Sequence, residues 1–158
     1  MEILNPFLDL KSKIVVITGG YGYLGKAMVD ILLKYGSTVY VLGRSKKKFD
    51  KIFTKQSSLF FCETNLESVS SIETSIERIG NKEGKIDVLI NNAYYGVSNH
   101  PEKMTSQEFR RGIDGGLNQF FDCIKSCISF LKLSENGKII NIASMYGIVV
   151  PDLGIYQG

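Results

Sequence analysis

Residues 14–25 read IVVITGGYGYLG, a short β-branched run followed by a turn that contains four glycines. The run Ile14–Thr18 is nearly all apolar, which is typical of a strand that is buried on both faces of a parallel sheet. The helical pattern that begins at Leu24 follows the turn directly. The segment therefore predicts a strand, a tight turn and a helix start in immediate succession.

The glycines of this turn suit a phosphate-binding site. Gly19 permits the tight turn, Gly22 lets the backbone approach a pyrophosphate, and Gly25 lets the helix pack closely on the strand. A helix N-terminus also offers unpaired N–H groups and a positive dipole end to phosphate. An ordinary loop is the alternative, but the strand–turn–helix context favours a nucleotide. We expect cofactor contacts throughout the turn, from Gly19, Gly20, Tyr21, Gly22, Tyr23, Leu24 and Gly25.

Strand-like and helix-like segments alternate along the rest of the chain. Further β-branched or aromatic runs occupy 38–42, 59–62, 86–90 and 138–142, and helical patterns occupy 24–35, 66–79, 106–116 and 117–131. This alternation predicts an α/β protein with right-handed crossovers, and one domain over residues 1–158. Gly36, Gly84 and Gly137 each precede a strand, where left-handed helix ends are expected.

Composition narrows the class of protein. The 158 residues are 44% hydrophobic and 22% charged, and the net charge of +3 is too small to indicate nucleic-acid binding. No apolar run approaches the roughly 20 residues of a membrane span, and the N-terminus does not resemble a secretory signal. We therefore expect a cytoplasmic protein. Cys123 and Cys127 share a helix face, but without a further Cys or His pair we expect buried thiols and no metal site.

The end of the second strand indicates the cofactor. A carboxylate there would hold the ribose 2′-hydroxyl of NAD, but the position is Gly43, and Arg44 follows it. A guanidinium binds a 2′-phosphate well, so the sequence favours NADP(H). The alternative, a solvated basic turn, explains some of the lysines at 46–48.

Three motifs in order resemble the short-chain dehydrogenase/reductase family: Thr18 to Gly25, Asn91-Asn92-Ala93 and Asn141-Ile142-Ala143-Ser144. The resemblance covers essentially the whole chain. It implies a Rossmann-type doubly wound parallel sheet with about five strands present, a small-molecule substrate and a homo-oligomeric parent protein. It also implies that Asn65 and Leu66 flank the adenine, that Asn92 and Ala93 lie under the nicotinamide-side ribose with Tyr94 beside them, and that Ser144 orients and polarises the substrate.

The sequence also departs from this family. The glycine spacing resembles its epimerase and dehydratase branch, whereas Asn-Asn-Ala and the short overall spacing resemble its classical branch. Tyr94 replaces the glycine that usually follows Asn-Asn-Ala. The helix asparagine that relays protons in the family aligns near Gly116, so that role is unfilled or belongs to Asn118.

The catalytic Tyr-x-x-x-Lys of the family is incomplete in these residues. Tyr156 follows Ser144 by 156 − 144 = 12 residues, near the usual gap, but Gly158 comes before any lysine. Tyr156 is either the catalytic tyrosine or a loop aromatic. The segment from Pro151 is similar to reductases of flagellin-glycan and sialic-acid-like sugar pathways, in which the tyrosine comes later. We therefore expect a fragment that lacks the C-terminal part of the fold.

Three functions remain open from the sequence. The first is an NADP(H)-dependent oxidoreductase for a carbonyl or secondary alcohol, with a sugar-like substrate in surface-glycan or flagellin modification as one option, and inactive as this fragment. The second is a catalytically dead nucleotide-binding module. The third is a nucleotide-sugar epimerase or dehydratase, which rests on the glycine spacing alone.

Overall fold

The computed structural model describes residues 9–96 and 99–149. Its five strands form one sheet in the order β3-β2-β1-β4-β5, and every neighbouring pair is parallel. The strands are β1 (Ile14–Thr18), β2 (Thr38–Gly43), β3 (Leu59–Glu63), β4 (Val88–Asn91) and β5 (Lys138–Asn141). The predicted doubly wound α/β fold is confirmed.

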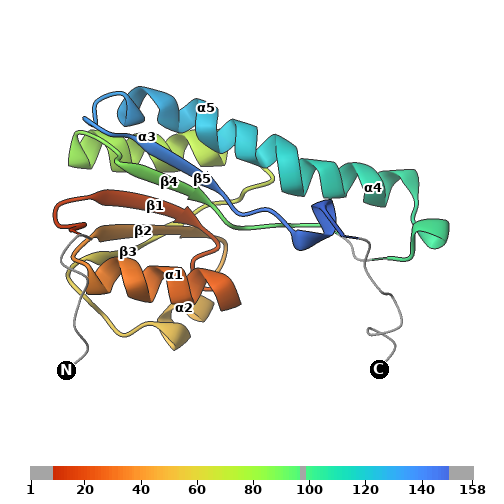
Figure 1. Ribbon diagram of the computed structural model, residues 1–158, viewed down its shortest axis with the longest axis horizontal. Helices are drawn as coiled ribbons and strands as arrows, with labels where there is room; N and C mark the ends of the chain where they lie inside the picture. The colour runs from red at the N-terminus through yellow and green to blue at the C-terminus, as the bar shows by residue number, and fades with distance from the viewer. Residues whose placement is uncertain (1–8, 97–98, 150–158) are drawn as a thin grey trace.

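Helices cover both faces of the sheet (Figure 1). On one face lie α1 (Tyr23–Lys34) and α2 (Lys46–Ile52), and on the other lie α3 (Val69–Glu83) and α5 (Gln119–Leu131). Each face of the sheet has its own hydrophobic core. Alternate residues of β1 pack in one core or the other, because successive side chains of a strand point to opposite faces. Val16 packs in the core beneath α3 and α5, whereas Val15 and Ile17 pack in the core beneath α1.

One long helical segment widens in its middle. It consists of α4 (Ser106–Ile113), a π-helical turn over Asp114–Asn118, and α5. The π-turn separates the part of the segment that packs on the sheet from α4, which extends past the ends of the strands (Figure 1). Within the described residues, no helix is long and apolar enough to cross a membrane.

Some boundaries differ from the sequence-based expectation. The helix predicted over 66–79 is α3, which begins at Val69 rather than Leu66, because the Ser68 side chain accepts a hydrogen bond from the Ser71 N–H and caps the helix there. The pattern at 86–90 forms a strand only from Val88. The helix α2 was not expected at all. Gly36 and Gly84 have φ of 90° and 78°, but Gly137 is not among the positive-φ glycines.

Gly137 is needed for a different reason. A Cβ added there would lie 2.5 Å from the Leu131 carbonyl oxygen, so the position requires close approach and not a left-handed backbone.

Candidate nucleotide-binding cleft

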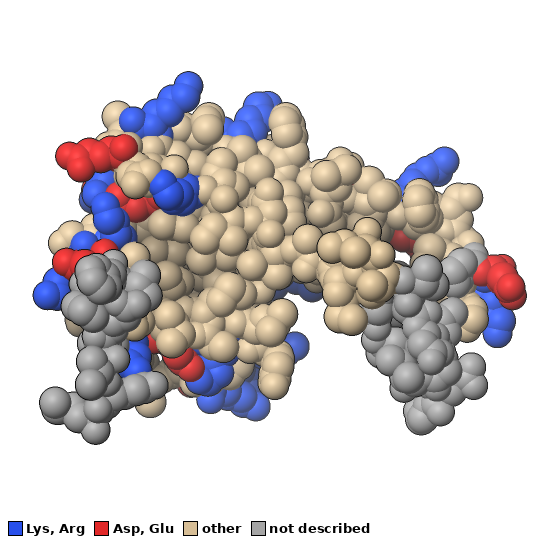
Figure 2. Space-filling view, viewed as in Figure 1, with Lys and Arg blue, Asp and Glu red and all other residues tan. Residues whose placement is uncertain are grey.

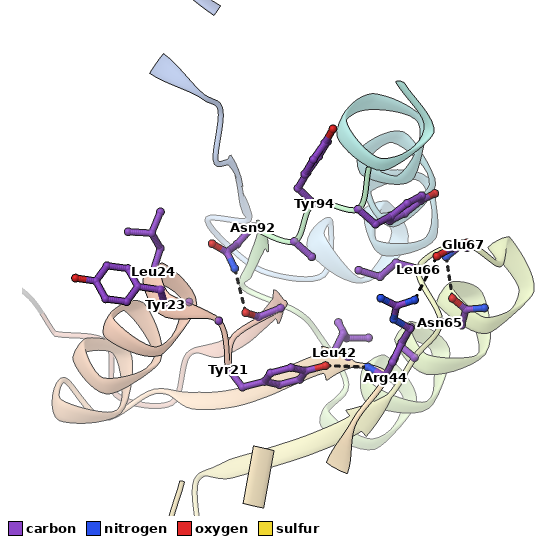
Figure 3. Close-up of a pocket in the computed structure, with 17 residues that line it drawn as sticks. Tyr21, Tyr23, Leu24, Leu42, Arg44, Asn65, Leu66, Glu67, Asn92 and Tyr94 are labelled. Atoms are coloured by element: carbon purple, nitrogen blue, oxygen red, sulfur yellow. Dashed lines mark hydrogen bonds and ion pairs between the residues drawn. The ribbon is translucent and has the colours of Figure 1, made fainter. Parts of the chain in front are cut away.

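A cleft with a volume of about 430 Å³ lies at the carboxyl ends of the strands, on either side of the glycine turn. The carboxyl ends are where open α/β sheets bind ligands. The lining residues, which Figure 3 draws as sticks, are Gly19, Tyr21, Gly22, Tyr23, Leu24, Gly25, Leu42, Gly43, Arg44, Thr64, Asn65, Leu66, Glu67, Asn92, Ala93, Tyr94 and Tyr95. Of the predicted cofactor contacts, all but Gly20 line it.

The glycine turn is compact for steric reasons. Gly19 has a φ of +64°, which strongly favours glycine. A Cβ at Gly25 would lie 2.4 Å from the Gly19 carbonyl oxygen, so α1 and the turn touch only because Gly25 has no side chain. Gly20 lies beneath the turn, where a Cβ would contact Ile17, Val29 and Val41 at 3.0 Å. Gly20 therefore contributes to packing and not to the wall of the cleft.

The N-terminus of α1 is open toward the cleft. Its N-cap is Gly22, which has no side chain to accept from the first N–H groups, and its first turn has no acidic residue. By contrast, α2, α3 and α4 begin with hydroxyl caps from Ser45, Ser68 and Thr105. Unpaired N–H groups and the positive end of the helix dipole favour an anion at this point. The arrangement fits the pyrophosphate of a dinucleotide.

Asn92 joins the glycine turn to the end of β4. Its side-chain Nδ2 donates to the carbonyl oxygens of Thr18 (2.9 Å) and Gly19 (3.2 Å), and its own backbone N–H donates to Thr18 Oγ1. The Ala93 N–H donates to the same Thr18 Oγ1 at 2.9 Å. Asn92 lines the cleft as expected, but its amide is used to fix the turn. Thr18, which was not among the predicted contacts, is the centre of this network.

At the end of β2, Arg44 lies beside the cleft with an exposed guanidinium. Its Nη1 is 3.3 Å from Glu67 Oε1, and Arg111 of α4 approaches the same oxygen at 2.8 Å. Figure 3 shows Arg44 and Glu67 facing each other across one end of the cleft. Exposed ion pairs of this kind contribute little free energy, so Arg44 can exchange Glu67 for a stronger anion.

The loop after β3 forms the wall opposite the glycine turn. The Glu67 N–H donates to Asn65 Oδ1 at 3.1 Å, and the Asn65 N–H donates to Ser71 Oγ at 2.9 Å. These bonds hold Asn65 and Leu66 at the cleft, where adenine contacts are expected. Glu67 was missed because its sequence position marks only a helix start, and its meeting with Arg44 depends on the strand order.

Tyr94, which Figure 3 labels, lines the cleft together with its neighbour Tyr95, which α4 approaches through Arg111. The Arg111 guanidinium lies 5.7 Å from the centre of the Tyr95 ring. Burial, together with the carboxylates of Asp114 and Glu67, raises the pKa of Tyr95 above its ordinary value of 10.0. Tyr95 is therefore a neutral phenol at physiological pH. No sequence signal pointed to it.

The π-turn is docked onto this end of the cleft by a buried amide. Gln119 Nε2 donates to the carbonyl oxygens of Ala93 and Gly115, the latter at 2.8 Å. Asn118 donates to Asp114 Oδ1 and lines a polar hollow beside α4 that adjoins the cleft, since Leu66, Glu67 and Tyr95 line both. A relay role for Asn118 stays a prediction.

The remaining predicted residues lie elsewhere. Ser144 follows β5 and is exposed, but it is not among the residues that line the cleft. Tyr156 lies outside the described residues. Burial raises the pKa of the Cys123 and Cys127 thiols to about 12, which makes them poor metal ligands and nucleophiles. In the described ranges, no three metal-binding side chains gather at one point.

Strand order and cleft together define a Rossmann-type α/β protein. The profile of the short chain dehydrogenase family matches residues 13–157. An uncharacterized oxidoreductase of Staphylococcus saprophyticus is 30% identical over 153 residues, which are 95% of this chain and 62% of that protein. The chain belongs to the short chain dehydrogenase family.

Solved structures share the fold and include both nicotinamide cofactors. The RhlG/NADP complex of Pseudomonas aeruginosa aligns with a TM-score of 0.85 at 21% identity, over 94% of this chain and 60% of that one. A short chain dehydrogenase of Leptospira borgpetersenii with bound NAD+ aligns with a TM-score of 0.84 at 25% identity, over 98% of this chain and 61% of that one. The chain thus spans about three fifths of the length of these relatives.

Proposed function

We propose that this chain is the cofactor-binding part of an NADP(H)-dependent oxidoreductase. The complete enzyme would transfer a hydride between nicotinamide C4 and a carbonyl or secondary alcohol of a small molecule. Membership of the short chain dehydrogenase family supports an oxidoreductase in general. The single observation that carries the choice of NADP(H) is the end of β2, where Gly43 provides no carboxylate and Arg44 faces the cleft.

Electrostatics support the phosphate-bearing cofactor. Arg44 has an exposed guanidinium, and Arg111 also pairs with Glu67, the acidic residue that meets Arg44 at the cleft. A 2′-phosphate carries more charge than a carboxylate and accepts two parallel hydrogen bonds from one guanidinium, so it would displace Glu67 from Arg44. The solved relatives carry NADP in one case and NAD+ in the other, so the proposal rests on these residues of the chain itself.

Other parts of the proposal rest on sequence. Ser144 would orient and polarise the substrate in the complete enzyme. A sugar-like substrate from flagellin or surface-glycan modification is supported by the resemblance of the segment that begins at Pro151. A cytoplasmic location is supported by the three cysteines, which are all free and buried.

The experiment is a fluorescence titration of the chain with NADPH and NADH. Arg44→Ala should weaken NADPH by roughly tenfold to a hundredfold, because a charge-assisted hydrogen bond is lost, and should change NADH little. Lys47→Ala is the matched control, since it removes a positive charge from an exposed position on α2 that does not line the cleft. Equal loss for both nucleotides would show that Arg44 does not contact the 2′-phosphate.

The dead-module hypothesis is tested with the same protein. No tyrosine of the chain is followed by a lysine four residues later, so the chain should bind NADPH without oxidising it. The oxidation of NADPH is measured by its absorbance after a panel of carbonyl compounds is added. A clear preference for NADH would instead favour the epimerase or dehydratase alternative.

A further inference from the structure

Tyr21 links the glycine turn to the end of β2. Its side chain crosses from the turn, and its hydroxyl accepts hydrogen bonds from the backbone N–H groups of Arg44 (3.0 Å) and Ser45 (3.4 Å). Figure 3 shows the ring lying along the floor of the cleft with the hydroxyl directed at Arg44. Behind it, the Phe61 ring packs at a centroid distance of 6.3 Å. The ring is therefore held in place from two sides.

The Tyr21 ring occupies the space of a side chain at position 43. A Cβ added to Gly43 would lie 2.4 Å from Tyr21 Cε1 and 2.6 Å from its hydroxyl oxygen. Both distances are far inside van der Waals contact, which for carbon atoms is roughly 3.5–4.0 Å. No aspartate or glutamate fits at position 43 while Tyr21 keeps this position. That is the position from which a carboxylate would select NAD.

The Tyr21 hydroxyl retains a proton to donate. Its oxygen accepts from two backbone N–H groups, and a phenol also has one O–H donor. Nothing in the described part of the chain accepts that proton, and Tyr21 lines the cleft beside Arg44. A phosphate oxygen on the ribose is an acceptor of suitable chemistry at this point.

We propose that Tyr21 is the residue that determines cofactor selectivity in this chain. It excludes a carboxylate from position 43 by filling its space, and it orders the Arg44 and Ser45 backbone while donating to the 2′-phosphate. The inference rests on the proposed binding of NADP(H) and deepens it. On this inference, position 43 has no acidic residue because the Tyr21 ring of the glycine turn fills the space that its side chain would need.

The first test isolates the hydroxyl. The probes are 2′,5′-ADP, which carries the 2′-phosphate, and 5′-AMP, which lacks it, each titrated by calorimetry into the 158-residue chain. Tyr21→Phe keeps the ring and should weaken 2′,5′-ADP by about tenfold while leaving 5′-AMP unchanged. Unchanged affinity for 2′,5′-ADP in this variant would overturn the donor role.

The second test asks whether the Tyr21 ring excludes an acidic side chain from position 43, and it uses NADH and NADPH as probes. Gly43→Asp alone should bind neither dinucleotide well, because its Cβ would lie 2.4 Å from Tyr21 Cε1. Gly43→Asp combined with Tyr21→Ala should bind NADH at least tenfold more tightly than NADPH. Tight NADH binding by Gly43→Asp with Tyr21 still present would overturn the exclusion.

The two proposals fail in different ways. If the unaltered chain binds neither NADPH nor 2′,5′-ADP, the proposed function fails and this inference fails with it. If the unaltered chain prefers NADPH but the Tyr21 variants keep that preference, only this inference fails. Thermal unfolding of each variant identifies any that is unfolded, and Tyr21→Phe, which is nearly isosteric, keeps the test decisive if Gly43→Asp does not fold.

Discussion

Asp87 connects three separate parts of the fold through one carboxylate. Its Oδ2 accepts from the Ile14 N–H at the start of β1 (2.9 Å), and its Oδ1 accepts from Ser134 Oγ (2.6 Å) and Lys85 Nζ (3.0 Å). The side chain is only 2% exposed. Burial opposes its ionisation, but the hydrogen bonds from Ser134, Ile14 and Lys85 outweigh burial, and the pKa of Asp87 lies below its ordinary value.

A lowered pKa in the folded state makes stability depend on pH. The ionised form of Asp87 stabilises the fold above the ordinary carboxyl pKa of about 3.9, and this contribution is lost as the pH falls through the lower folded-state value. Asp87→Asn should lower the free energy of unfolding at pH 7 by about 1–3 kcal/mol. In urea titrations the variant should also lose less stability than the unaltered chain between pH 5 and pH 3.

Asp50→Asn is the matched control for Asp87. Asp50 forms only an exposed ion pair with Lys46 on α2, so its loss should change stability little at either pH. A variant at Asp87 that behaves like the one at Asp50 would contradict the structural role of the buried carboxylate.

At the scale of elements, the π-turn fixes the position of Tyr95 at the cleft. A Cβ at Gly115 would lie 1.5 Å from the Tyr95 carbonyl oxygen, whereas a Cβ at Gly116 would meet only the Tyr94 ring, at 3.5 Å. The two glycines are adjacent in one turn, yet only the first is required by close approach. The second has space for a methyl group.

This difference predicts opposite effects of the same substitution. Gly115→Ala should lower the free energy of unfolding by about 1–3 kcal/mol through overpacking, and should weaken nucleotide binding because Tyr95 lines the cleft. Gly116→Ala should stabilise the chain by about 0.5–1 kcal/mol, because alanine loses less backbone entropy in a helix. Urea unfolding measures the stability of the two variants, and NADPH titration measures their nucleotide affinity. Equal effects would show that the approach of Tyr95 to Gly115 is not tight.

The elements also show what the sequence could and could not predict. The bounds of β1 were predicted without error, because its β-branched run ends at the glycine turn. Helix α2 was missed because its sequence, KKKFDKI, presents only two apolar residues and no repeated stripe. Arg44 was expected at the cleft from its position after the second strand, and Asn65 and Asn92 were expected there from the family resemblance. Glu67, Arg111 and Tyr95 were not, since they meet only through strand order and the π-turn.

At the scale of the whole molecule, β5 forms one edge of the sheet in the described part of the chain. All four of its residues are exposed, and Ile140 retains 45% of its surface. Figure 2 shows charged side chains mainly at the periphery of the visible face, with few in its central part. An exposed apolar strand edge is a template for pairing with another chain.

We therefore expect this chain to self-associate in a concentration-dependent manner. Ile140→Lys should shift sedimentation velocity profiles toward the monomer, because a charged residue on an edge strand opposes pairing. Ile31→Lys places the same charge on the exposed surface of α1, where Ile31 is 53% exposed, and should leave the association unchanged. Equal shifts in both variants would point to general solubility and not to β5.

The contact between Gly43 and Tyr21 also restricts the order in which this sequence can evolve. An acidic residue at position 43 collides with the tyrosine that is already present, so that change is unfavourable as a first step. Loss of the Tyr21 ring meets no steric obstacle and opens the space, although it removes the hydrogen bonds that Arg44 and Ser45 donate to the hydroxyl. A lineage that exchanges one nicotinamide cofactor for the other would therefore change its glycine turn first and its second strand afterwards.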